Sequence, residues 1–185
     1  MFYLPSHYRS VFVSSPIGEL EVRASADAVV FLGRVTHPVA AAVRVSGVLL
    51  DAAEQLRAYF RGDLTRFDLP LDPQGTEFQR SVWCALQEVQ FAEIVSYATH
   101  ARRAGRPRAA RAVGAALGRN PIPVIVPCHR VVGANGSLTG FALGIETKRW
   151  LLEHEMRVAG RTPTDRAQSE GRVVRTETRK PASES

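Results

Sequence analysis

The chain has 185 residues, of which 45% are hydrophobic, and a formal net charge of +6. This length allows one large or two small globular domains with a substantial core, and no apolar run is long enough for a transmembrane helix. The positive charge favours an anionic partner, nucleic acid first, although a basic, arginine-rich protein without such a partner explains it equally well.

The two cysteines, Cys84 and Cys128, lie far apart and form no CxxC pair. Two thiols are too few for a structural zinc site of the Cys-rich kind. Residues 1–10 lack the apolar segment of a secretory signal, so we expect a cytoplasmic protein with no membrane partner. In that reducing compartment both cysteines should be free thiols.

Residues 1–74 are predicted to form an N-terminal α/β domain. Residues 11–18, 19–23 and 28–35 are typical of strands, and residues 48–60 have a helical period that ends at Gly62. Residues 63–74 are polar and contain two prolines, which indicates a linker. His7 and His37 are isolated and are expected at the surface. The apolar face of the helix would consist of Leu49, Leu50, Ala53, Leu56, Tyr59 and Phe60.

A second, mainly α-helical domain is predicted over residues 75–159. Thr76 is a suitable N-cap for a helix that would run to about Gln90, and Cys84 within it should have a packing or surface role. The predicted apolar stripe of this helix is Phe78, Val82, Trp83, Leu86 and Val89.

Residues 95–118 have the pattern of two helices joined by a turn at Gly105, the second opening near Pro107. This is the pattern of a helix-turn-helix, whose second helix enters a DNA groove. Small side chains and a basic leading end suit the minor groove better than the major groove. An alanine-rich core helix with a solvated basic end explains the pattern equally well. The alanines are Ala109, Ala110, Ala112, Ala115 and Ala116, and the arginines are Arg106, Arg108 and Arg111.

Residues 120–132 are predicted to present a nucleophile. The apolar run at residues 123–126 is too short and proline-flanked for a helix, so we expect a buried extended segment. Pro127 would stiffen the backbone before Cys128, and His129 could act as its base, directly or through a water. A buried structural cysteine is the alternative, and for an isolated cysteine it would be the better interpretation.

Downstream, residues 133–140 form a turn-rich loop and residues 144–156 a helix. Glu146, Glu153 and Glu155 are all candidates for a carboxylate that orients His129, and the residue pattern does not choose among them. Residues 160–185 are polar and are predicted to be a disordered tail.

The motif Pro127-Cys-His-Arg-Val131, preceded by Asn120-Pro and by an Ala-Ala-Arg-Ala-Val-Gly helix, resembles the O6-alkylguanine-DNA alkyltransferase family. The resemblance runs from about residue 76 to residue 155, and Ser15-Pro-Ile-Gly-Glu-Leu20 extends it into the first domain. It implies a ribonuclease H-like N-terminal domain and, in the C-terminal domain, a helix-turn-helix beside the active site.

The resemblance also implies catalytic roles. Cys128 would accept the alkyl group from guanine O6, and His129, oriented by Glu155, would act as a water-mediated base. Tyr97 would donate a proton toward guanine N3, and Asn120 would hold the turn between the DNA-binding helix and the active-site segment. The reaction would need no metal or organic cofactor.

For DNA binding, the resemblance implies that Arg111 fills the space left by the flipped nucleotide. The remaining DNA contacts would come from Ala109, Ala110, Arg106, Arg108 and Tyr97. The backbone carbonyls of Cys128 and Val131 would accept from the guanine amino group, the N–H of Ala142 would face O6, and Phe141 and Leu143 would complete the pocket.

The partner implied is double-stranded DNA containing O6-alkylguanine, bound through its minor groove by a monomer, with several copies able to pack along the DNA. Each molecule would transfer one alkyl group irreversibly and stop, with O4-methylthymine as a secondary substrate. The lesion must be flipped out of the duplex, and a damaged pair costs less to open.

Four positions depart from the family pattern: His100, Leu117, Phe141 and Leu143. Of these, Leu143 is expected to narrow the pocket for bulky adducts while sparing methyl.

Three other interpretations of the chain exist. A lesion sensor would lack the acceptor cysteine, a transcription regulator would carry base-reading side chains, and a cysteine hydrolase would need an oxyanion-hole signature.

Overall fold

The computed structural model describes residues 8–35 and 47–160. His7, His37 and residues 161–185 of the predicted tail lie outside these ranges. None of the helices within them combines the length and the hydrophobicity needed to cross a bilayer.

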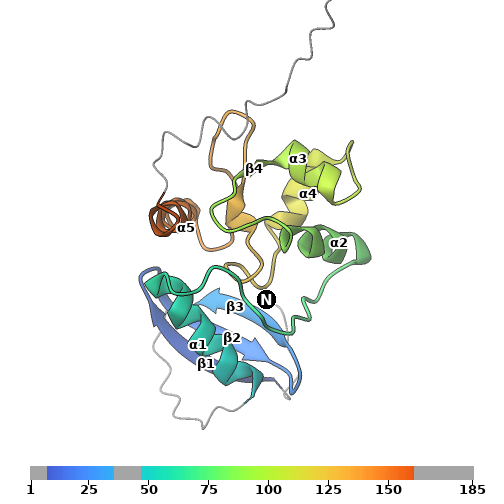
Figure 1. Ribbon diagram of the computed structural model, residues 1–185. Coiled ribbons are helices and arrows are strands. Elements are labelled where there is room, and N and C mark those ends of the chain that lie inside the picture. Colours follow the sequence, from blue (N-terminus) through green and yellow to red (C-terminus); the bar gives the residue numbers. More distant parts are fainter. Residues whose placement is uncertain (1–7, 36–46, 161–185) are drawn as a thin grey trace, which may run out of the picture.

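The first part of the chain folds into an antiparallel sheet with one helix against it (Figure 1). Strands β1 (Arg9–Ser15), β2 (Gly18–Ala24) and β3 (Val29–Arg34) lie in the order β1-β2-β3. Apolar residues lie opposite one another across the strands, so that Val22 pairs with Val11 on one side and with Leu32 on the other. The prediction of a small sheet plus a helix is therefore confirmed.

Helix α1 (Val48–Arg61) covers one face of this sheet and ends at Gly62, whose φ of 86° gives the left-handed cap. The predicted apolar face was wrong at one position. Leu50 is 41% exposed, whereas Ala52 is fully buried, because the buried stripe runs through Leu49, Ala52, Ala53, Leu56 and Tyr59 and leaves Leu50 at its edge. Tyr59, near the end of the helix, is also fully buried.

The predicted linker is attached to the sheet rather than free. The backbone N–H of Val29 donates to Pro70 O and that of Asp72 donates to Val29 O, both at 2.9 Å, so the chain pairs with the start of β3 at Leu71. It then enters α2 (Glu77–Leu86), whose N-cap Thr76 forms a reciprocal capping box with Gln79.

The remaining elements form the second part of the molecule. They are the two-residue strand β4 (Val95–Ser96), α3 (Tyr97–Arg103), α4 (Ala110–Leu117), the 3-10 helix η1 (Cys128–Arg130), the strand β5 (Val131–Val132) and α5 (Ile145–Val158). Strands β4 and β5 pair in parallel. Helices α2, α3 and α4 gather on one side, while α5 lies on the other (Figure 1).

Two predicted helix boundaries were wrong. Helix α2 ends at Leu86 rather than near Gln90, because the Val89 N–H already closes a turn onto Leu86 O at 3.0 Å. Helix α4 begins at Ala110, not at Pro107. The N–H of Ala109 bonds to Arg106 O at 2.9 Å, so residues 106–109 form a turn ahead of the helix.

The segment that leads to Cys128 is buried as predicted, but it is not extended. Pro123 and Val126 form a bridge across a tight turn, and Val124 within it has a φ of 77°. The Val126 N–H donates to Ile122 O at 2.9 Å. Prolines on both sides prevent this stretch from joining a sheet ladder, so its backbone groups are satisfied within the turn.

Candidate active site

Cys128 begins η1 and is 3% exposed. Its Sγ accepts a hydrogen bond from Nδ2 of Asn120 at 3.1 Å. Burial raises the pKa of the Cys128 thiol to about 11, against the opposing effects of the Asn120 hydrogen bond and the Lys148 charge. The resting site therefore holds a thiol rather than a thiolate at neutral pH, and a base is needed to activate it.

His129 is fully buried next to this thiol and can be that base. Its Nε2 lies 2.8 Å from Oε1 of Glu155, and since an ionised carboxylate only accepts, Nε2 must carry the proton. Its Nδ1 has no hydrogen-bond partner among the described residues. Burial lowers the pKa of His129, although Glu155 opposes this, so Nδ1 offers a lone pair to a proton.

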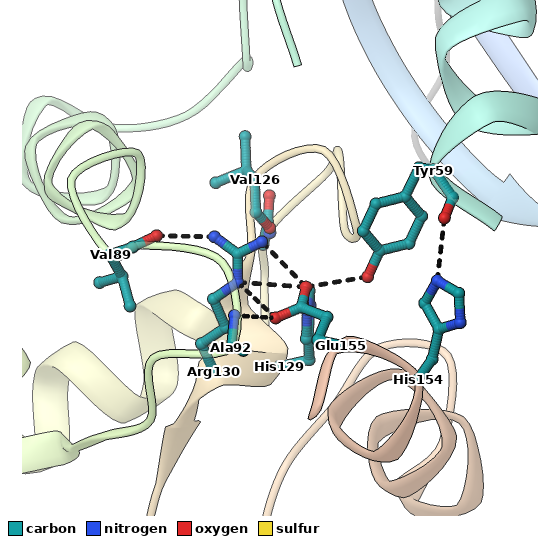
Figure 2. A network of polar contacts seen from close by, with 9 residues as sticks. Tyr59, Val89, Ala92, Val126, His129, Arg130, His154 and Glu155 are labelled. Carbon is teal, nitrogen blue, oxygen red and sulfur yellow. Dashed lines mark hydrogen bonds and ion pairs between the residues drawn. The ribbon is translucent and has the colours of Figure 1, made fainter. Parts of the chain in front are cut away.

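Glu155 is the centre of a buried polar network (Figure 2). Besides His129, its carboxylate accepts from the guanidinium of Arg130, from the Tyr59 hydroxyl at 2.9 Å and from the Ala92 N–H at 2.9 Å. Burial alone raises the pKa of this carboxyl, but the pairing with His129 and Arg130 outweighs burial and holds it well below its usual range.

The structure distinguishes among the three glutamates that the residue pattern left as candidates for orienting His129. Only Glu155 bonds to His129 within the described chain, whereas Glu146 and Glu153 are exposed on other faces of α5. Glu146 pairs instead with Arg149 at 2.6 Å.

Arg130, Tyr59 and Lys148 belong to the site and were missed by sequence reasoning. Lys148 is fully buried, and burial lowers its pKa to about 8 against the raising effect of Cys128. A signal for it existed, because Lys148, Leu151 and Glu155 are spaced to lie on one helical face. Arg130 lies inside the Cys-His-Arg motif, but the residue spacing does not predict its contact with Glu155. Tyr59 was interpreted only as one residue of the apolar face of a helix.

The loop at residues 139–144 is held at both ends. At its start, Thr139 O accepts from the Tyr97 hydroxyl and from Nζ of Lys148, each at 2.9 Å. At its end, Nη2 of Arg34 bonds to Leu143 O at 3.3 Å and to Oγ1 of Thr147 at 2.5 Å. Tyr97 and Lys148 come from the helical part and Arg34 from β3, so both parts of the molecule position this loop.

The predicted pocket residues lie along this loop and beside η1. Phe141 meets His129 edge-on, with ring centroids 6.3 Å apart, and Val131 is buried in β5. Ala142 and Leu143 line a cavity of about 620 Å³ between β3 and residues 118–123. Asn120 is part of its wall but Cys128 is not, so a role for Leu143 in limiting adduct size stays a prediction.

Apart from Tyr97 on α3, the predicted DNA-binding residues lie on α4 and in the turn before it. Helix α4 buries Val113 and Leu117 and leaves Arg111 and two alanines, Ala112 and Ala115, exposed. The indole N–H of Trp83 donates to Ala116 O at 2.9 Å and ties α4 to α2. Ala109 and Ala110 are half-buried at the start of α4, while Arg106 and Arg108 are exposed in the turn before it.

Asn120 connects this surface to the thiol. It follows the end of α4, its Nδ2 donates to Val126 O at 2.8 Å as well as to Cys128, and its Oδ1 accepts from the Ile122 N–H. The Asn120 side chain thereby links the end of α4 to the Cys128 turn. Within the described residues, no cluster of three or more His, Cys, Asp or Glu side chains could hold a metal ion.

The other two departures from the family pattern are buried. His100 lies in α3 with Nε2 3.2 Å from Val82 O, and burial lowers its pKa. Leu117 is 2% exposed at the end of α4. Cys84 is exposed on α2.

The protein combines a sheet unit (β1–β3 and α1) with a helical unit (α2 to α5), and it buries a cysteine next to a histidine–glutamate pair. The family described as 6-O-methylguanine DNA methyltransferase, DNA binding domain, matches residues 77–157. A methylated-DNA–protein-cysteine methyltransferase of Mycobacterium bovis is 45% identical over 164 residues, covering 86% of this chain and 96% of the relative. The relative of the same name from Methanosarcina acetivorans is 55% identical over 105 residues, covering 57% and 67%.

Among solved structures, the chain is similar to Mycobacterium tuberculosis OGT in complex with DNA, with a TM-score of 0.72 and 44% identity over 82% of this chain and 94% of that one. The chain belongs to the methylated-DNA–protein-cysteine methyltransferase family. The resemblance carried by residues 127–131 is thus confirmed.

We predict that Glu155→Gln destabilises the protein by about 3 kcal/mol at pH 7, because it leaves the buried Arg130 charge uncompensated. A carboxyl with a lowered pKa contributes stability above its unfolded pKa of about 4.3 and loses it as the pH falls toward the folded value. The difference from the unmodified protein should therefore shrink in acid. Urea unfolding at neutral and acid pH measures it.

Glu153→Gln, on the exposed face of the same helix, is the matched control and should unfold like the unmodified protein. Equal destabilisation by both variants, or a difference that is independent of pH, would contradict the assignment of Glu155 as the ionised centre.

Proposed function

We propose that the protein repairs O6-alkylguanine in duplex DNA by moving the alkyl group, methyl first, irreversibly onto Cys128. The observation that carries this proposal is the buried thiol next to a Glu155-oriented imidazole, tied through Asn120 to an exposed helix of small and basic residues. The names of the relatives, and the structure of a relative with DNA, support it.

The proposed reaction is one direct displacement. A water would carry the Cys128 proton to Nδ1 of His129, and Glu155 would stabilise the resulting imidazolium. The sulfur attacks the alkyl carbon, the carbon–O6 bond breaks, and its electron pair leaves on the guanine. Tyr97 donates a proton toward N3 of the guanine, and the proton that His129 took from Cys128 replaces it. In the net reaction, Cys128 exchanges its thiol hydrogen for the alkyl group.

The product explains the proposed single turnover. A thioether is stable in water, because the thiolate is a poor leaving group from its carbon. The displacement needs only a thiol, a base and a proton donor, so no metal or organic cofactor enters the proposed reaction. The same displacement extends to O4-methylthymine, which presents an alkyl group on a comparable exocyclic oxygen and is the proposed secondary substrate.

In the proposed complex, α3 and α4 act as a helix-turn-helix with α4 in the minor groove. The exposed alanines let its backbone approach closely, and Arg111 takes the place of the flipped nucleotide. We further propose a cytoplasmic monomer, nucleoid-associated when bound to DNA, several copies of which can bind along one duplex. The likeness of the sheet unit to ribonuclease H belongs to the same proposal.

The proposal is tested by incubating the protein with a duplex oligonucleotide that carries O6-methylguanine. We expect the peptide containing Cys128 to gain the mass of one methyl group, with one equivalent per protein. Exposed Cys84 is the internal control and should stay unmodified. Cys128→Ser should bind the duplex without removing the methyl group. Binding by the unmodified protein without any gain of mass at Cys128 would indicate a lesion sensor instead.

We predict that Tyr97→Phe slows transfer at least tenfold and leaves DNA affinity nearly unchanged, because a general acid acts mainly on the chemical step. Single-turnover rates and titration with labelled duplex measure the two effects. Thr139→Val controls for the side-chain part of the loop contact, since it removes the hydroxyl that donates to Tyr97 but keeps the phenol and its bond to Thr139 O. If that variant were as slow as Tyr97→Phe, proton donation would not be the role of Tyr97.

We predict that Arg111→Ala weakens duplex binding and reduces base flipping. A fluorescent base analogue at the lesion reports flipping, and titration at fixed salt reports affinity. Arg57→Ala removes the same charge from the exposed side of α1 and should leave both unchanged. Equal losses in the two variants would assign the effect of Arg111 to net charge alone.

A further inference from the structure

Tyr59 belongs to α1 of the sheet unit, yet its hydroxyl lies inside the polar network of the helical unit (Figure 2). The hydroxyl donates to Oε1 of Glu155 at 2.9 Å, and the residue is fully buried. Its ring packs among those of Phe67, Phe91 and His154, with centroids 5.3, 6.2 and 5.4 Å away. The phenol is therefore held in one orientation, aimed at the carboxylate.

The two oxygens of Glu155 have different partners. Oε2 accepts from Arg130 and from the Ala92 N–H, whereas Oε1 accepts from Arg130, Tyr59 and His129. The Tyr59 hydroxyl and the His129 ring thus share one oxygen. A donor on that oxygen draws charge away from it and weakens its attraction for the neighbouring imidazolium.

We infer that Tyr59 is a positioning residue for alkyl transfer: through its hydrogen bond to Glu155, the sheet unit sets the orientation and the basicity of His129. This inference rests on the proposed function of Cys128 and deepens it. It assigns the N-terminal part of the chain a role in positioning His129, the proposed base for Cys128. The fold of that part alone does not suggest such a role.

Tyr59 is suited to this role across the working pH range. Burial, and next to it the charge of Glu155, raise the pKa of Tyr59 well above its usual value, so the phenol stays a neutral donor. The charged or titratable groups facing His129 are Glu155 and Lys148 from α5, Arg130 and Cys128 from η1, and Tyr59 through Glu155. Of these, only the Tyr59 contact can be removed without changing a charge near the site or losing the proposed nucleophile.

A purely structural role for Tyr59 would be to join α1 to α5. The chain provides a separate contact for that purpose, because Nε2 of His154 lies 2.9 Å from the backbone oxygen of Tyr59. The backbone contact joins the helices and the phenol contacts the carboxylate, so the two roles can be tested by different substitutions.

The test compares Tyr59→Phe with His154→Phe in single-turnover transfer from an O6-methylguanine duplex, from about pH 5 to about pH 9. Tyr59→Phe keeps the ring packing and removes one hydroxyl. With that donor gone, Glu155 attracts the imidazolium more strongly, so the acid limb of the profile should move to higher pH by about half a unit. The rate near neutral pH should fall about three- to tenfold.

His154→Phe should lower the melting temperature and leave the acid limb in place. Melting curves of both variants show that they are folded, and DNA titration should give unchanged affinities. The inference would be overturned if the Tyr59→Phe rates fell by the same factor at every pH. It would also be overturned if His154→Phe shifted the acid limb in the same way. Failure of the unmodified protein to gain a methyl group at Cys128 would instead overturn the proposed function, so the two failures are distinguishable.

Discussion

The rest of the site depends on the hydrogen bonds and ion pairs of the buried Glu155 carboxylate. A charge removed from water costs several kcal/mol unless it is fully paired, and here the pairing comes from α1, from the segment before β4 and from η1. A displacement of any of these elements would leave charge or hydrogen-bonding capacity unsatisfied. The carboxylate therefore fixes the relative placement of segments that are far apart in the chain.

The thiol is prepared in a different way. Its burial favours the neutral form, while Asn120 and Lys148 favour the thiolate. A buried neutral thiol reacts slowly with electrophiles in solvent, which suits the single use proposed for Cys128. Asn120 joins this thiol to the end of α4, so the surface proposed to meet DNA and the atom proposed to react share one side chain.

The loop at residues 139–144 links both parts of the molecule to the site. Tyr97 and Lys148 hold its first carbonyl, and Arg34 from β3 holds its last residues. The sheet unit thus contacts this loop at Leu143 as well as Glu155 through Tyr59. Both units contribute contacts around the proposed site, although the motif residues all lie in one of them.

Local patterns were enough to predict much of this protein. Extended and apolar runs, one of them alternating, predicted the three strands. A helical period and Gly62 predicted α1, and the capping signal at Thr76 predicted the start of α2. These features depend on neighbours within a few residues, which the sequence contains directly. The motif around Cys128 and His129 also identified the family, because it joins rare residue types at fixed spacing.

What only the tertiary structure decided depends on long-range contacts. Glu155 became distinct from Glu146 and Glu153 only when α5 packed against η1. Tyr59 and Glu155 are separated by 96 positions, and no local pattern distinguishes a tyrosine that only fills space from one whose hydroxyl meets a carboxylate. The turn before Cys128 was likewise misjudged as extended, because its backbone conformation is set by the groups that surround it. The sequence determined which reactive side chains are available. The packing of α1 and α5 around η1 determined which of these side chains contact one another.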